Sequence, residues 1–254
     1  MSLEVIVLGC GSSAGTPVIG CRCSTCSSDN PRNRRTRASV AVRANSTTFL
    51  IDTGPDLRLQ ALREQIDRID AVLYTHQHAD HLNGIDDLRA YCFHQRGAIP
   101  LYGNVFTLND IQQRFSYAFF PPSNYWDKPV LQAHPVEREF SVNGVTVTPI
   151  PVLHGQWPIY GYRVGNFAYI TDVSEIPASS WPLLEGLDVL LLDSLRRVPH
   201  PTHFSFEQAV DHAGRIGAQQ TYLIHMTHEL SYEAMCDALP GNIRPAHDGL
   251  KIVL

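Results

Sequence analysis

The sequence lacks any apolar run that approaches the roughly 20 residues of a membrane-spanning helix. Its first apolar stretch contains Glu4 and has no basic residues before it, which argues against a secretory signal. We therefore expect a cytosolic protein without a membrane partner. No linker separates two halves, so the 254 residues are expected to form one domain, 1–254, with a substantial core.

An excess of positive charge is absent as well. The formal net charge is -5 at pH 7, and the field of such a molecule does not attract a long nucleic acid. A local basic patch could still hold a small anion. The six cysteines are unevenly placed, since three cluster at Cys21, Cys23 and Cys26 and three are scattered. This pattern is poor for a disulfide framework and suits a metal site in a reducing compartment.

A glycine-rich turn at residues 9–15 follows the first predicted strand, 3–8. Such turns can cradle phosphate, but no Lys-Ser/Thr pair follows, which argues against a nucleotide P-loop. We interpret the stretch as a tight turn near the site. Four arginines follow later in the chain, at Arg32, Arg34, Arg35 and Arg37.

Two interpretations of these arginines stay open: they form a solvated face, or they contact a phosphate at the site entrance.

What the sequence does contain is a dense group of metal-binding residue types. Residues 71–74 form an apolar run typical of a buried strand, and residues 76–81 then hold three histidines and an aspartate. Side chains two apart in an extended segment point to the same side, so His76 and His78 can reach one metal ion. Asp80 and His81 are adjacent and diverge. A helix beginning near Asp80 would turn both toward a second ion.

The rest of the chain predicts an α/β protein in which candidate ligands follow strands. His154, Asp172 and His225 each come just after the carboxyl end of a predicted strand, where α/β folds place their sites. The aromatic stretch 104–126 is either an amphipathic helix packed on the core or a lid, and its role is left open. Strands are expected at 39–43, 47–52, 71–74, 99–102, 145–152, 162–171 (a hairpin), 188–192 and 221–224, and helices at 56–65, 86–93 (continuing the helix near Asp80) and 206–216.

The HxHxDH run of residues 76–81 resembles the signature of the metallo-β-lactamase superfamily. Asp52-Thr53-Gly54 resembles its first motif, in which the aspartate supports the site without binding metal. His78 stands where redox di-iron members carry a glutamate, which favours hydrolysis. The resemblance implies an αββα sandwich of two facing mixed sheets with helices outside. It assigns His76, His78 and His154 to a first metal and Asp80, His81 and His225 to a second, with Asp172 bridging the two.

Two further segments indicate a particular family within this superfamily. The CxCxxC of Cys21, Cys23 and Cys26, together with an HxxH at 225–228, resembles the phosphoribosyl cyclic phosphate phosphodiesterase family of bacterial phosphonate breakdown. His228 can turn away from the catalytic pair and complete a structural zinc site with the three cysteines. Phosphodiesterase members place a catalytic histidine between the later ligands. His203 is the predicted general acid, with His200 as its competitor, and Asp248 is expected to orient a ligand histidine.

The resemblance therefore implies a dinuclear phosphodiesterase acting on a small cyclic or nucleotide-like phosphodiester. A hydroxide bridging two manganese or zinc ions would attack phosphorus, with Asp80 and His203 as catalytic residues and one further zinc as a structural ion. Two alternatives are a thioesterase or lactonase of the same fold and a non-hydrolytic accessory protein of cofactor biosynthesis. The natural substrate, the choice between manganese and zinc, and the oligomeric state stay open, a homodimer being one alternative.

Overall fold

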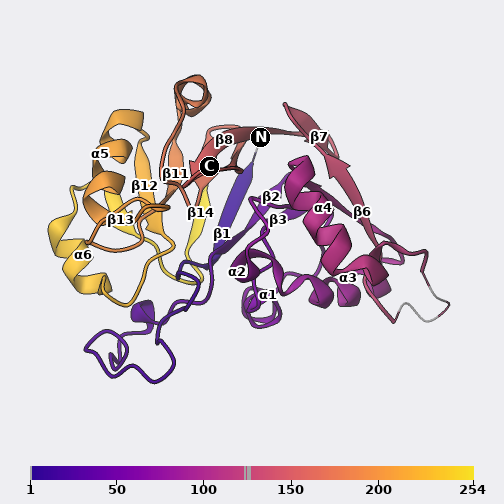
Figure 1. Ribbon diagram of the computed structural model, residues 1–254, viewed down its shortest axis with the longest axis horizontal. Coiled ribbons are helices and arrows are strands. Elements are labelled where there is room, and N and C mark those ends of the chain that lie inside the picture. Colours follow the sequence, from indigo (N-terminus) through magenta and orange to yellow (C-terminus); the bar gives the residue numbers. More distant parts are fainter. Residues whose placement is uncertain (1, 123, 125–126) are drawn as a thin grey trace.

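The computed structural model describes residues 2–122, 124 and 127–254, and two facing sheets form its centre (Figure 1). Each sheet has seven strands and is mixed, with an antiparallel half and a parallel half. In spatial order the first sheet contains β14 (Lys251–Val253), β1 (Leu3–Gly9), β2 (Ser39–Ala44), β3 (Thr47–Ile51), β4 (Ala71–Leu73), β5 (Ile99–Gly103) and β6 (Leu131–Pro135). The second contains β13 (Ile243–Pro245), β12 (Gln220–Ile224), β11 (Val189–Asp193), β10 (Phe167–Ile170), β9 (Trp157–Val164), β8 (Val145–His154) and β7 (Phe140–Val142).

Helices lie on the two outer sides of this sandwich (Figure 1). The αββα arrangement expected from the sequence is thereby confirmed. Within the described residues, no helix combines the length and the apolar character needed to cross a bilayer. On the side of the first sheet lie α1 (Leu57–Glu64), α2 (Ala79–Leu82), α3 (Leu88–Gln95) and α4 (Val105–Arg114), and on the side of the second lie α5 (Phe206–Ile216) and α6 (Tyr232–Ala238). Short 3-10 helices occur at Pro31–Asn33, Ile85–Asp87, Ser116–Phe119 and Ala178–Leu184.

The period of two along each strand divides the core into two layers. In β1, Val5 and Val7 face the second sheet and belong to the cluster between the sheets. Their neighbours Ile6 and Leu8 face outward and pack in the cluster that includes residues of α1 and α3. Both faces of the first sheet are covered, which explains why its strands are apolar almost without interruption.

Helix α5 illustrates how local chemistry positions the site. The Ser205 hydroxyl accepts from the N–H of Gln208 at 3.3 Å, and the Gln208 side chain accepts from the N–H of Ser205 at 2.9 Å. This capping box begins the helix, and Gly217 ends it with a φ of 69°. The helix is the one predicted at 206–216. Because its start is fixed, His203 is held two residues before the cap.

One predicted helix is interrupted. We expected 86–93 to continue the helix that starts near Asp80, but α2 ends at Leu82, and a 3-10 turn separates it from α3. The chain passes so close to the loop after β3 that a Cβ on Gly84 would collide with the carbonyl oxygen of Gly54. The N–H of Gly84 also donates to the carbonyl of Thr53 at 2.9 Å. This close approach redirects the chain after Leu82.

The aromatic stretch 104–126 contributes a helix, as one of the two interpretations held, and its Phe115 and Phe119 are partly buried against the core. Helix α4 packs through Leu108 and Ile111, which are buried. Phe106 and Phe120 are each 62% exposed. Leu108 and Ile111 are three residues apart and share a face of the helix, whereas Phe106 lies on another. Tyr125 and Trp126, part of the same stretch, lie outside the described residues.

Asp248 ties the end of the chain to its beginning. Its carboxylate accepts from the N–H of Cys10 at 3.1 Å, from the N–H of Thr36 at 2.9 Å and from the Thr36 hydroxyl at 2.6 Å, and it forms an ion pair with Arg63 at 3.4 Å. These partners are not ligand histidines, so the expected role in orienting one was wrong. The residue instead joins β1, the segment before β2 and α1.

We expect Asp248→Ala to lower the free energy of unfolding by about 2–4 kcal/mol, because several donors lose their acceptor where only 10% of the side chain is exposed. Asp237→Ala, at an exposed position of α6, is the matched control and should change it by less than about 0.5 kcal/mol. Urea unfolding at constant m-value measures both. Equal stability of the two variants would contradict this role.

Candidate metal centre and active site

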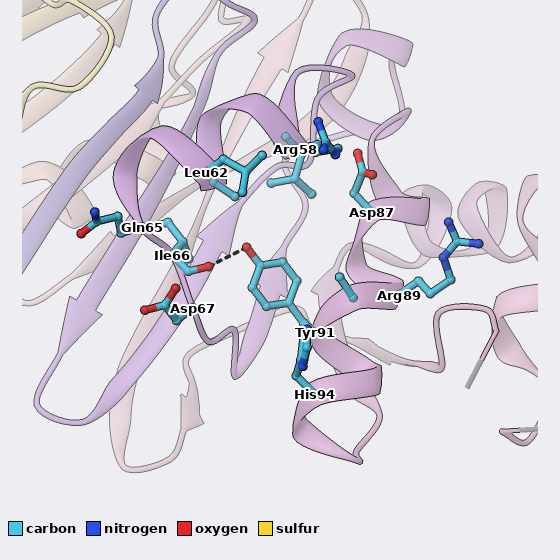
Figure 2. A pocket seen from close by; sticks show the side chains of 12 residues that line it. Arg58, Leu62, Gln65, Ile66, Asp67, Asp87, Arg89, Tyr91 and His94 are labelled. Carbon is cyan, nitrogen blue, oxygen red and sulfur yellow. Dashed lines mark hydrogen bonds between the residues drawn. The ribbon is translucent and has the colours of Figure 1, made fainter. Parts of the chain in front are cut away.

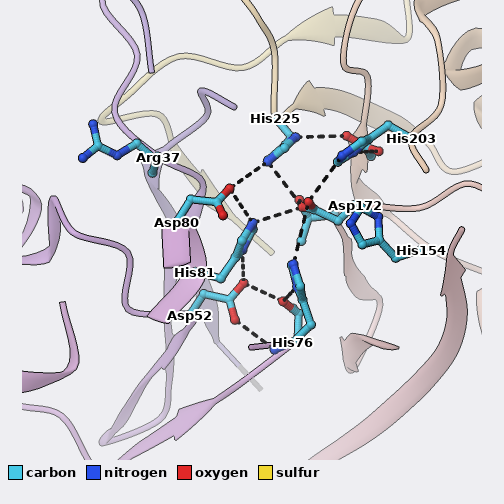
Figure 3. Close-up of polar contacts among 12 residues, drawn as sticks. Arg37, Asp52, His76, Asp80, His81, His154, Asp172, His203 and His225 are labelled. Carbon is cyan, nitrogen blue, oxygen red and sulfur yellow. Dashed lines mark hydrogen bonds and ion pairs between the residues drawn. The ribbon is translucent and has the colours of Figure 1, made fainter. Parts of the chain in front are cut away.

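The seven predicted ligands of the catalytic pair meet at one edge of the sandwich, where both sheets contribute. His76 follows β4 of the first sheet, whereas Asp172 follows β10 and His225 follows β12 of the second. Their side chains point toward a common centre (Figure 3). In each of two sets the ligand atoms lie within 4.8 Å of one another: His76, His78, His154 and Asp172 form the first set, and Asp80, His81, Asp172 and His225 form the second.

Asp172 belongs to both sets. Its Oδ1 lies 3.2 Å from Nε2 of His81 and 3.4 Å from Nε2 of His225. Its Oδ2 faces the other way, 3.9 Å from Nε2 of His76. A carboxylate whose two oxygens face two separate ligand sets is placed to bridge two cations.

Three residues of the site have left-handed backbone conformations. The φ angles are 65° at Asp52, 54° at Asp172 and 57° at His225. Such conformations cost on the order of 1–3 kcal/mol each in residues other than glycine and persist only where surrounding contacts impose them. Each of the three follows closely after a strand. The turn away from extended geometry at those points redirects the chain at the edge where the ligands meet.

Buried hydrogen bonds set which nitrogen of each histidine faces the centre. Nδ1 of His81 lies 2.7 Å from Oδ2 of Asp52, and the N–H and hydroxyl of Thr75 donate to the same carboxylate at 2.9 and 2.8 Å. Nδ1 of His154 lies 2.8 Å from the carbonyl of Thr202. Since Nδ1 donates in both cases, Nε2 is left with a lone pair toward the centre.

The residues fit a pair of divalent cations by a further observation. Among the described residues, Nε2 of His76 and Nε2 of His81 are buried and have no hydrogen-bond partner. Buried polar atoms are nearly always satisfied, and a cation at the centre would satisfy both. Burial lowers the pKa of His76, which keeps the imidazole in the neutral form that binds metal.

His203 lies beside the ligand sets. Its ring stacks on that of His225 with 5.0 Å between centroids, and its Nε2 lies 3.8 Å from Oδ2 of Asp172. Burial alone would lower its pKa, but the charges of Asp193 and Asp172 outweigh this effect and raise the pKa to about 9. His200, its competitor, is half-buried and turns Nδ1 toward the hydroxyl of Thr202 at 3.1 Å.

Asp193 is a residue of the site that the sequence analysis missed. Its Oδ2 lies 3.1 Å from Nδ1 of His203, and its Oδ1 lies 3.6 Å from Nδ1 of His225. The N–H of Val173 also donates to Oδ2, at 3.0 Å. The available signal was an acidic residue directly after the predicted strand 188–192, which is the signal that marked Asp52 and Asp172.

The cysteine cluster meets His228 as the sequence predicted. Nδ1 of His228 lies 3.4 Å from Sγ of Cys21 and 3.3 Å from Sγ of Cys23, and Cys26 completes a set within 4.8 Å. The N–H of Cys26 and the ring of His228 lower the pKa of Cys23 to about 6. Burial raises the pKa of Cys26 to about 11, and a bound cation would offset this by stabilising the thiolate. Three thiolates and an imidazole suit zinc.

The arginine run is not wholly a solvated face, because one of its members is buried. Arg35 is 2% exposed, and its guanidinium donates to the carbonyls of Thr227 at 3.1 Å and Leu230 at 2.7 Å. It therefore joins the N-terminal loop to the segment that carries His228. Arg37 pairs with Asp56 at 3.1 Å. Only Arg32 and Arg34 are exposed.

A hollow apart from the metal centre lies elsewhere on the described surface. It has a volume of about 720 Å³ and opens between α1 and α3, on the outer side of the first sheet (Figure 2). Tyr91 at its floor donates to the carbonyl of Ile66 at 2.8 Å, and Arg58 and Asp87 lie at its edge. None of the ligand sets lines it. The chemistry therefore places the reaction at the metal centre.

The comparisons with known proteins agree with this geometry. The family described as "Beta-lactamase superfamily domain" matches residues 47–226, which include all seven ligands of the two sets. The chain belongs to the beta-lactamase superfamily. Within this superfamily it resembles a solved diphosphatase from the PhnP family, at 43% identity and a TM-score of 0.94 over 100% of this chain and 98% of that chain. The resemblance to the cyclic phosphate phosphodiesterase family is thereby confirmed.

Two other relatives differ in what they support. Zn²⁺-bound PqqB from Methylobacterium extorquens is 22% identical with a TM-score of 0.77, covering 99% of this chain and 100% of that chain, which shows the superfamily fold alone. A protein named octanoyltransferase from Porphyromonas gingivalis is 38% identical over 257 residues, covering 99% of this chain and 52% of that protein. The chain thus spans about half the length of this relative.

We expect Cys26→Ser to remove one metal ion per chain and leave the catalytic pair, because it breaks the cysteine cluster without touching the two ligand sets. Elemental analysis after dialysis measures the loss. Cys236→Ser, at a half-buried cysteine outside the cluster, is the control and should keep the full metal content. Unchanged metal content in Cys26→Ser would show that the cluster holds no ion.

Proposed function

We propose that the protein is a metal-dependent hydrolase that cleaves a small phosphodiester, cyclic or nucleotide-like, including the diester form of a diphosphate. The observation that carries the proposal is the position of His203, which Asp193 holds at 3.1 Å beside two ligand sets that share one carboxylate. The similarity to a diphosphatase supports phosphorus chemistry. The net charge of -5 supports a small substrate over a long nucleic acid. We further propose a cytosolic protein, with a homodimer as one assembly to test.

The ligand residues have defined roles in this proposal. One ion would be held by His76, His78 and His154, and the other by Asp80, His81 and His225. Asp172 belongs to both sets and would hold both ions. When bound, two manganese or zinc ions supply Lewis acidity and lower the pKa of a water molecule to about 7. Two divalent cations exceed the charge of the two carboxylates, so the centre attracts an anion.

His203 supplies the proton that the leaving oxygen needs. Asp193 holds Nδ1 of the ring at 3.1 Å, so Nε2 faces the centre and carries the transferable proton. An alkoxide is a poor leaving group without such a donor, whereas a thiolate leaves without one. The position of His203 therefore favours a phosphodiester over a thioester.

A thioesterase is the second candidate, and one observation favours it. The match to half of a protein named octanoyltransferase associates this chain with acyl chemistry. Turnover of S-lactoylglutathione or an octanoyl thioester, without phosphodiesterase activity, would support this alternative. A non-hydrolytic accessory role would require a fully metal-loaded protein that is inert on all diesters.

We expect the manganese-loaded protein to hydrolyse bis(p-nitrophenyl) phosphate and 2′,3′-cyclic AMP. His203→Ala should lower kcat for the cyclic nucleotide by about 100-fold or more, because the departing alkoxide loses its proton donor, and should lower it less for the other ester, whose p-nitrophenolate leaves without one. The variant should keep both catalytic ions by elemental analysis. His94→Ala, at an exposed position of α3, is the matched control and should retain full activity. Full activity of His203→Ala would remove this residue from the mechanism.

Asp193→Asn should reduce kcat and move the alkaline limb of the pH–rate profile to lower pH. The sign follows from the charge of Asp193, which raises the pKa of His203 against the effect of burial. Without that charge, His203 loses its proton at lower pH. Profiles of kcat for both proteins, at equal metal content, give the comparison. A parallel drop at every pH would indicate a purely structural role.

A further inference from the structure

Two hollows flank the metal centre. The first has a volume of about 290 Å³ and is lined by His203 and His225, next to the second ligand set. The other has a volume of about 330 Å³ and is lined by His78 and His154 of the first set, together with Trp157. A substrate whose reacting phosphorus lies at the centre would therefore extend one arm into each hollow.

The first hollow is the one that receives the leaving group, an assignment that rests on the proposed function. His203 lines this hollow and not the other. A hydrogen-bond donor stabilises the charge that develops on the departing phosphate oxygen, which must lie within its reach. The arm beside Trp157 then stays attached to the phosphorus under attack.

The first hollow presents donors suited to a second phosphate. Arg196 lines it, and its Nε donates to the carbonyl of Val198 at 3.2 Å, the one hydrogen bond of this guanidinium within the described part of the chain. The glycine-rich turn lines the same hollow and is closed by a 2.8 Å bond from the N–H of Gly15 to the carbonyl of Ser12.

The tip of that turn adds two backbone donors. The N–H groups of Ser13 and Ala14 have no partner among the residues that the structure describes, and both residues line the hollow. Ser13 and Ala14 are exposed, and free N–H groups and a guanidinium that line one hollow suit an anion. Glu229 also lines the hollow, but it is exposed, so solvent screens its charge.

The second hollow offers a flat apolar surface. Trp157 is 50% exposed, and its ring lies 5.5 Å from that of His78. An exposed indole beside a polar centre stacks well on a planar ring such as a nucleobase. The two hollows thus differ in chemistry, one basic and hydrogen-bonding, the other aromatic.

We propose that the substrate is an unsymmetrical diphosphate diester. Its planar-ring arm stacks on Trp157, and its leaving arm is a phosphate monoester held by Arg196 and the N–H groups of Ser13 and Ala14. One water molecule is consumed. Its oxygen bonds to the phosphorus of the planar-ring arm, the anhydride P–O bond breaks, and the electron pair departs with the phosphate of the leaving arm. Both products are phosphate monoesters.

ADP-ribose is a suitable probe, because one arm carries adenine and the other is ribose 5-phosphate. Arg196→Ala should lower the ratio of kcat/KM for ADP-ribose to kcat/KM for bis(p-nitrophenyl) phosphate by about 10- to 100-fold, since only ADP-ribose places a second phosphate in the hollow. Arg197→Ala is the matched control, because the neighbouring arginine pairs with Glu207 at 3.3 Å, and it should leave the ratio unchanged. An unchanged ratio in Arg196→Ala would overturn the proposal.

Hydrolysis in ¹⁸O-labelled water tests the orientation. We expect the label in AMP, because the adenosine-bearing phosphorus is attacked. Label in ribose 5-phosphate would overturn the assignment of the two arms. Trp157→Ala should raise KM for ADP-ribose, and Trp157→Phe should restore it in part.

The proposed function and this inference can fail separately. A protein inactive on both ADP-ribose and bis(p-nitrophenyl) phosphate would refute the proposed phosphodiesterase activity. Calorimetry with ribose 5-phosphate as ligand would still test the phosphate site at Arg196. Binding that is lost in Arg196→Ala and kept in Arg197→Ala would support the phosphate site. No binding to the metal-loaded wild type would refute it.

Discussion

The site depends on one shared carboxylate, that of Asp172. Its two oxygens face two ligand sets contributed by both sheets, so the sandwich must hold β4, β8, β10 and β12 in register for the centre to exist. Uncompensated, five histidines and two carboxylates at such distances would be costly to bury. The bonds from Asp52, Thr75 and Thr202 stabilise the orientations of the histidines. The left-handed backbone at Asp52, Asp172 and His225 turns the chain where the ligands meet.

Long-range tethers surround this centre and give it rigidity. Asp248 joins the last turn of the chain to Cys10 and Thr36, and Arg35 joins the N-terminal loop to the carbonyls beside His228. The cysteine cluster acts on the same loop. This loop also forms one wall of the hollow beside His203, through Ser13 and Ala14. Segments near the two ends of the chain, distant in sequence, therefore shape the pocket together.

Most of the fold and much of the candidate site could be predicted from the sequence. The apolar runs identified the central strands, and the ligand candidates after them are where the structure places the ligand sets. The interruption at Gly84 could not be predicted, because it results from contact with Gly54 in a neighbouring loop. The burial of Arg35 could not be predicted either. A charged residue in a basic run gives no local signal of burial against carbonyls almost two hundred residues away.

Residue types, strand periodicity and helix caps are local properties, so the sequence by itself determined most of the central strands, the start of α5 and the identity of the seven ligand candidates. Tertiary structure alone decided that Asp193 holds His203, that Asp172 turns one oxygen to each ligand set, and that Arg196 and the turn at Ser13 line one hollow. Those relations join residues from different strands and loops. They are distances across a packed sandwich, which depend on how the two sheets face each other and not on any segment considered alone.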